Sequence, residues 1–100
     1  MGIKTEPWDV TEHLDSDEAI AAYLEAVLED GDAALFTAAL GDVARARGMT
    51  ELAEAAGMSR SGLYKALGEG GNPSFGTVLE LLKAVGVRLS AEPVHKAEAA

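Results

Sequence analysis

The chain has 100 residues, of which 48% are hydrophobic and only 5% aromatic, a composition typical of one small domain with an alanine- and leucine-rich core. The absence of cysteine excludes disulfides and thiolate metal sites, and no apolar run approaches the ~20 residues that cross a bilayer, so we expect a protein of the reducing cytoplasm with no membrane partner. The formal net charge of −9 excludes a surface that is basic throughout.

The charge is divided unevenly along the chain. Residues 1–43 carry eleven carboxylates and one lysine, a net charge of −10, whereas residues 44–100 carry seven basic and six acidic side chains, a net charge of +1. The acidic half predicts a cationic protein partner, although it equally suits a solvated helix face. The second half is compatible with DNA binding, which would be modest for a monomer and stronger for a homodimer.

We predict an all-α fold of five helices, with a short strand near the C-terminus. Residues 1–14 form an N-terminal arm, residues 15–93 the folded domain and residues 94–100 a flexible tail. The first helix, acidic and covering 17–30, begins after a cap at Asp15 or Ser16 and ends at Gly31. A second helix follows a cap at Asp32 and closes at Gly48, and its apolar face supports the segment that comes next.

Residues 50–67, TELAEAAGMSRSGLYKAL, predict a helix-turn-helix with helices over 50–56 and 60–67. We expect Thr50 to cap the first helix, Gly57 to take a positive φ at the turn, and Ser59 to cap the second helix. Leucine and alanine at helical spacing face inward, and the small Ala53 lets the two helices cross closely.

The second of these helices presents polar side chains that suit the major groove of DNA. Arginine and lysine donate to guanine edges or phosphates, serine serves either, and tyrosine adds a ring with a hydroxyl. The principal candidates are Arg60, Ser61, Tyr64 and Lys65. Ser59, Thr50 and Arg47 are further candidates at the groove edge. The alternative is a purely structural helical hairpin.

The remaining elements follow a glycine-rich loop over residues 68–73. Ser74 restarts helix, and Asn72, Ser74 and the amides beside them are candidate phosphate contacts. Val87, Leu89 and Ala91 then alternate with polar residues at the period of a short strand. This strand can pair with its symmetry mate in a homodimer, which makes these three residues dimerisation candidates; the alternative is a packed extended tail.

No pattern in the chain points to catalysis. His13 and His95 are the only histidines, and no carboxylate cluster around them has metal-ligand spacing. Serines near Lys65 lack a base or an oxyanion arrangement, and no lysine follows the glycines at 68, 70 and 71 as in a phosphate-binding loop. We therefore expect no enzymatic activity, metal, cofactor or small-molecule substrate.

Three stretches together resemble a known family. These are EHLDSDEAIAAYLEAVLEDGD, LGDVARARGMTELAEAAGMSRSGLYKAL and GNPSFGTVLELLKAVGVRLSAEP, the last two being the specific ones. From Trp8 to Pro93 the chain is similar to small Xre-type helix-turn-helix antitoxins, the antidotes of addiction modules whose toxins are of the RelE and HigB type. Gly62 and Gly76 depart from the pattern, because each stands where a better helix former is expected.

The resemblance implies two activities. The protein would bind and neutralise a basic, RNA-cleaving toxin, and it would repress its own operon by binding operator DNA. In that case Glu18, Glu25, Glu29 and Asp30 of the acidic helix are the candidate toxin contacts. The alternatives are a stand-alone repressor without a toxin, and a protein-interaction module whose hairpin no longer binds DNA.

Overall fold

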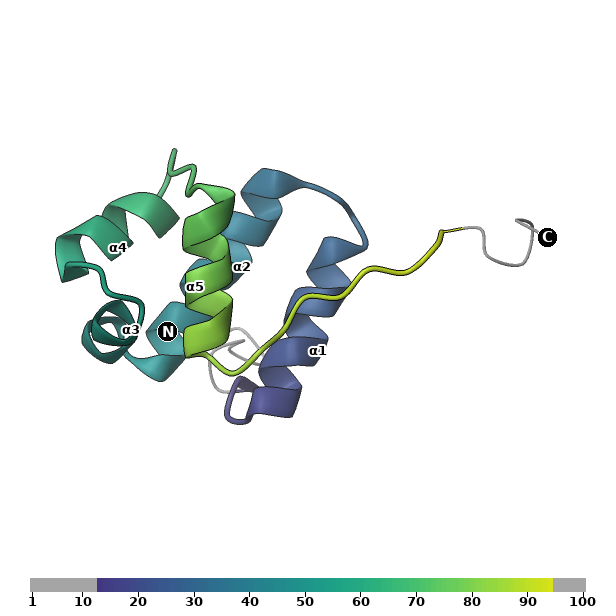
Figure 1. Ribbon diagram of the computed structural model, residues 1–100, viewed down its shortest axis with the longest axis horizontal. Helices are drawn as coiled ribbons and strands as arrows, with labels where there is room; N and C mark the ends of the chain where they lie inside the picture. The colour runs from purple at the N-terminus through teal and green to yellow at the C-terminus, as the bar shows by residue number, and fades with distance from the viewer. Residues whose placement is uncertain (1–12, 95–100) are drawn as a thin grey trace, which may run out of the picture.

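The structure is a computed structural model that describes residues 13–94, and the secondary structure in that range is entirely helical. Five helices follow one another within these residues: α1 (Asp17–Leu28), α2 (Ala33–Arg47), α3 (Met49–Ala55), α4 (Arg60–Leu67) and α5 (Phe75–Ala84). In Figure 1, α3 and α4 lie at one end of the molecule, α1 lies toward the other, and α2 and α5 stand between them. The predicted all-helical fold is confirmed. None of the described helices is long and apolar enough to cross a membrane.

Four helices begin at a side chain that accepts a hydrogen bond from a backbone amide three residues later. The capping residues are Ser16, Asp32, Ser59 and Ser74, as the sequence predicts. Each cap satisfies one of the amides that a helix start leaves without an intrahelical partner.

Two predicted helix boundaries are wrong. Thr50 does not cap α3. Gly48, with φ of 102°, is both the C-cap of α2 and the N-cap of α3, and no side chain caps the start of α3. The acidic helix ends at Leu28, and residues 29–31 form a turn that closes at Gly31 with φ of 69°.

One core joins all five helices. Its largest fully buried side chains are Ile20, Val43, Leu63, Leu81 and Leu82, which come from α1, α2, α4 and α5. Leu14 is also buried, so this end of the predicted arm belongs to the core. Residues 1–12 of the arm and 95–100 of the tail lie outside the described residues.

The predicted C-terminal strand is not formed in the single chain. Residues 87–93 run extended past α1 (Figure 1), but no β-ladder occurs between residues 13 and 94. The reason is physical: an extended segment becomes a strand only when it pairs with a second one, and residues 13–94 hold no second strand for it to pair with. Val87 and Leu89 instead pack, partly buried, against the core.

A half-buried phenol connects α1 to α2. The Tyr23 hydroxyl donates a hydrogen bond to an Asp42 carboxylate oxygen over 2.7 Å, and Arg45 forms an ion pair with the same carboxylate. Burial, followed by the hydrogen bond and the negative charge of Asp42, raises the pKa of Tyr23 from 10.0 to about 12.

This raised pKa predicts a pH dependence of stability. Because the folded-state pKa is above the unfolded value, the contribution of Tyr23 is complete below pH 10 and is lost as the pH rises from 10.0 to about 12. We expect Tyr23→Phe to cost about 1 kcal/mol at pH 8 and to flatten the fall in stability above pH 10. Urea unfolding midpoints between pH 8 and 11.5 measure the loss of stability at pH 8 and its change with pH. Parallel pH profiles for the two proteins would contradict the assignment.

Candidate nucleic-acid interface

The connection between α3 and α4 is a tight turn built on Gly57. Gly57 takes φ of 72°, its amide donates to the Glu54 carbonyl over 3.1 Å, and the Met58 amide donates to the Ala53 carbonyl over 2.8 Å. This pair of hydrogen bonds is the Schellman arrangement, in which a left-handed residue satisfies the last carbonyls of a helix. The positive φ predicted at Gly57 is confirmed.

α4 leaves this turn through the Ser59 cap. The Ser59 hydroxyl accepts a hydrogen bond from the Gly62 amide over 2.9 Å. A Cβ at position 62 would stand 2.9 Å from that hydroxyl oxygen, so a glycine leaves the cap undisturbed. The glycine that departs from the family pattern therefore has a local structural reason.

α4 has one buried face and one exposed polar face. Leu63 and Leu67 are buried, at 0% and 8% exposure, and pin the helix to the core. At about 100° per residue, the four principal candidates share an arc of about 140°, and the middle of that arc lies about 110° around the helix from the two buried leucines. All four are exposed: Arg60, Ser61, Tyr64 and Lys65.

Arg60 and Tyr64 interact with each other one helical turn apart. The Arg60 guanidinium donates to the Tyr64 hydroxyl over 3.3 Å and lies 5.3 Å from the centre of its ring. A cation over an aromatic face is attracted to it, so the tyrosine orients the arginine before any ligand arrives. Tyr64 remains 49% exposed, which leaves its ring accessible.

The secondary candidates are placed differently. Thr50, Asn72 and Ser74 are exposed. The Ser74 hydroxyl is already engaged, since it accepts from the Thr77 amide and donates to the Thr77 hydroxyl. A hydrogen bond from the Ser74 hydroxyl to DNA would therefore compete with its hydrogen bonds to Thr77.

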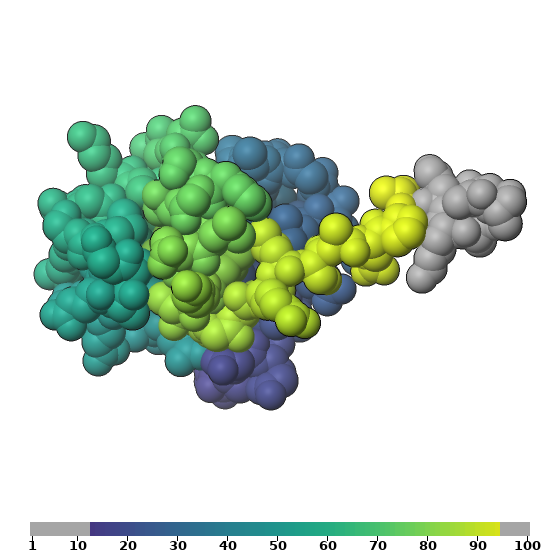
Figure 2. All heavy atoms as spheres, in the orientation of Figure 1, coloured from purple at the N-terminus to yellow at the C-terminus, as the bar shows by residue number. Residues whose placement is uncertain are grey.

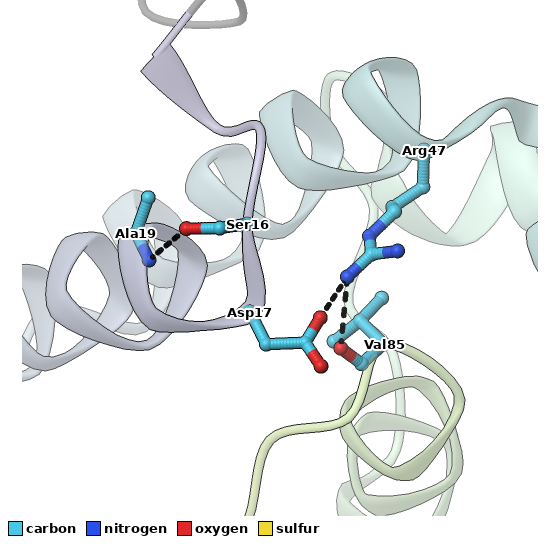
Figure 3. A network of polar contacts seen from close by, with 5 residues as sticks. All are labelled: Ser16, Asp17, Ala19, Arg47 and Val85. Atoms are coloured by element: carbon cyan, nitrogen blue, oxygen red, sulfur yellow. Dashed lines mark hydrogen bonds and ion pairs between the residues drawn. The ribbon is translucent and has the colours of Figure 1, made fainter.

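Arg47 takes part in an intramolecular network with Asp17 and Val85 (Figure 3). Its guanidinium forms an ion pair with Asp17 at the start of α1 and donates to the Val85 carbonyl over 3.5 Å. The contact joins the ends of three helices, α1, α2 and α5. Because thirty residues separate Arg47 from Asp17, no local pattern in the sequence indicates it. We leave Arg47 out of the proposed DNA contacts.

The acidic candidates form a stripe along α1. Glu18, Glu25 and Glu29, spaced seven and four residues apart, lie on one side of the helix, and Asp30 lies in the turn after it. All four are exposed, while Ile20 and Leu24 fill the core from another face. The stripe is thus open to solvent and to a partner.

The cap of α4 gives a stability test. We expect Ser59→Ala to lower the free energy of unfolding by about 1 kcal/mol and Ser59→Gly by only a few tenths. Ser61→Ala is the matched control, because the Ser61 hydroxyl makes no hydrogen bond within residues 13–94. Urea unfolding measures all three. Equal losses at positions 59 and 61 would refute the capping role.

Comparison with known proteins places the chain in a family. A family model described as "Probable addiction module antidote protein" matches residues 4–93. An uncharacterized protein of Haemophilus influenzae is 47% identical over 85 residues, which are 85% of this chain and 88% of that protein. No solved structure matches significantly. Because the family match spans most of the sequence, this chain belongs to the family of probable addiction module antidote proteins.

Proposed function

We propose that the chain is the antitoxin of a type II toxin-antitoxin module and acts in the cytoplasm. It neutralises a basic RNase toxin of the RelE or HigB type by direct binding, and it represses its own operon as a DNA-binding homodimer. Membership of the antidote family supports the antitoxin role and favours it over a stand-alone repressor.

The exposed polar face of α4 is the observation that supports DNA binding. We propose that α3 and α4 are a helix-turn-helix and that α4 enters the major groove with its N-terminal residues against base edges. Arg60, oriented by Tyr64, is the proposed base contact, and Lys65 is a phosphate contact. Ser61, in the first exposed turn of α4, is a further proposed contact to base or phosphate. Ser59 and Thr50 are proposed contacts at the groove edge, and Asn72 and Ser74, with the amides beside them, are proposed phosphate contacts.

The electrostatics of α4 suit this orientation. Both of its charged side chains, Arg60 and Lys65, are cations on the exposed face, so the helix is positive although the whole chain is negative. The acidic stripe lies on α1, toward the other end of the molecule in Figure 1, where it does not repel the duplex.

The acidic stripe supports toxin binding. Glu18, Glu25, Glu29 and Asp30 are exposed, and none of them is in an ion pair within the described residues. Four unpaired carboxylates at one end of the molecule attract a basic protein and orient its approach. We propose this stripe as the contact with the toxin.

DNA binding is tested by gel shift on the operon's promoter. We expect Arg60→Ala to cost ~1–3 kcal/mol, at least about fivefold in affinity, and to relax base preference at one position. Lys65→Ala should weaken all sequences alike and reduce the salt slope by about 1. Lys83→Ala removes the same charge from α5 and should change neither the operator affinity nor the salt slope. Unchanged operator affinity in the Arg60 variant would rule out this base contact.

Toxin binding is tested by neutralising the stripe. The triple variant Glu18→Gln, Glu25→Gln and Glu29→Gln should weaken toxin binding about tenfold at low salt, measured by calorimetry, since exposed charges each contribute modestly. The matched control, Glu54→Gln, Glu69→Gln and Glu80→Gln, changes net charge equally at exposed positions on α3, in the turn after α4 and on α5. Equal losses in both triples would show that only net charge matters.

A further inference from the structure

The extended segment 87–93 has unused backbone hydrogen-bonding groups. The Val87 amide donates to the Leu82 carbonyl over 2.9 Å, but no hydrogen bond within residues 13–94 involves the backbone of residues 88–94. Arg88, Ser90 and Glu92 are exposed, while Val87 and Leu89 are partly buried on the other face. The segment already has the alternation and conformation of a strand and lacks only a neighbour.

An open apolar groove lies along the same segment. It has a volume of about 900 Å³ and is lined by α1, the first turn of α2, both ends of α5 and residues 87–94. Leu28 and Phe75 line it and remain 44% and 67% exposed, and Val94 is 87% exposed just beyond the far end of the segment. Figure 2 shows residues near 90–94 projecting beyond the body of the molecule. A single chain leaves this apolar surface uncovered.

We propose that a second copy of this chain covers the groove by pairing its own segment 87–93 antiparallel to the first, with the two-fold axis at Ser90. The proposal rests on the homodimer of the proposed function and specifies its contact. The projecting end of each segment then lies over the groove of the other copy. Glu25 and Glu29 of the acidic stripe also line this groove, so the second copy and the toxin share that part of α1, whereas the exposed polar faces of the two α4 helices remain free at the far ends.

Charge complementarity selects this register. With the axis at Ser90, Arg88 of each copy stands opposite Glu92 of the other, so two ion pairs form, and Leu89 stands opposite Ala91. An axis at Leu89 or Ala91 leaves Arg88 and Glu92 only diagonal to each other and places neither directly opposite a charge of the other sign. An axis between two residues would place the apolar side chains of one copy on the same face as the polar side chains of the other. This register is excluded because Val87 and Leu89 are partly buried, so the apolar face of both copies must point toward the core.

The backbone selects the same register. Successive residues of a strand direct their N–H groups to opposite edges, and the Val87 amide is directed inward, toward Leu82. The amides of Arg88, Ser90 and Glu92 therefore lie along the outer edge, where they bond across the axis. Pro93, which has no N–H, falls on the inner edge and costs no hydrogen bond.

The test is a charge exchange measured by sedimentation equilibrium on the purified full chain, without DNA or toxin. Arg88→Glu and Glu92→Arg each place two like-charged pairs across the axis, and each should raise the dimer Kd about tenfold or more. Mixing the two variants restores two opposite-charged pairs, so the mixture should form heterodimers with nearly wild-type Kd. Circular dichroism checks that both variants keep their helices, since neither side chain forms an ion pair within residues 13–94.

A wild-type chain that stays monomeric at tens of micromolar, or a mixture that fails to recover, would overturn the proposal. So would variants that dimerise normally but lose the toxin, because the toxin would then occupy the groove. Operator gel shifts and toxin calorimetry on the same samples report the proposed function separately.

Covalent trapping gives an independent readout. The chain has no native cysteine, so Ser90→Cys introduces one thiol, which the axis places opposite its own copy at about 5.5 Å between Cα atoms. Mild oxidation should convert most of this variant to a disulfide dimer at low micromolar concentration. Ala22→Cys, exposed on α1, is the control and should remain mostly monomeric. Equal cross-linking of the two variants would contradict the placement of the axis.

Discussion

The turn at Gly57 is the constraint on which the proposed DNA-binding surface depends. Its positive φ lets the amides of Gly57 and Met58 bond back to the end of α3, which fixes the direction in which α4 leaves. A Cβ at position 57 would meet nothing within 4 Å, so the requirement for glycine is conformational and not steric. Any other residue in this region of φ costs roughly 1–2 kcal/mol. With the direction fixed, Leu63 enters the core and the polar face of α4 is turned to solvent.

The molecule separates its charges by element, and this separation lets one small chain serve two kinds of partner. α4 offers cations at one end, and α1 offers carboxylates toward the other (Figure 1). DNA attracts cations, whereas a basic toxin attracts carboxylates. Cations and carboxylates mixed on one face would therefore weaken the binding of both partners. The arrangement also leaves the apolar groove beside α1 away from the recognition face, where a second copy does not block the duplex.

Features governed by neighbouring residues could be predicted from the sequence. The caps at Ser16, Asp32, Ser59 and Ser74 act over three residues, and Gly57 acts over a single turn, so each is visible in the local pattern. The predicted cap at Thr50 failed because a single glycine, Gly48, both ends one helix and begins the next. A serine or threonine near a helix start is only one of several ways to begin a helix.

Features that depend on tertiary contacts could not be predicted. Arg47 is a cation beside the motif, but its ion pair with Asp17, thirty residues away at the start of α1, has no local signal in the sequence. The burial of Leu14 and the exposure of Phe75 likewise follow from packing between distant segments. The strand predicted near Leu89 has the right alternation but needs a second chain, which the sequence of one copy does not supply.

The most direct measurement of the central claim is an amide NMR titration of the labelled protein with its operator duplex. The account predicts that the largest shift changes fall on residues 59–65, with smaller ones at the first turns of α3 and α5 and little change along α1. Changes concentrated on Glu18 to Glu29, with α4 unaffected, would contradict the assignment of α4 as the DNA-binding helix.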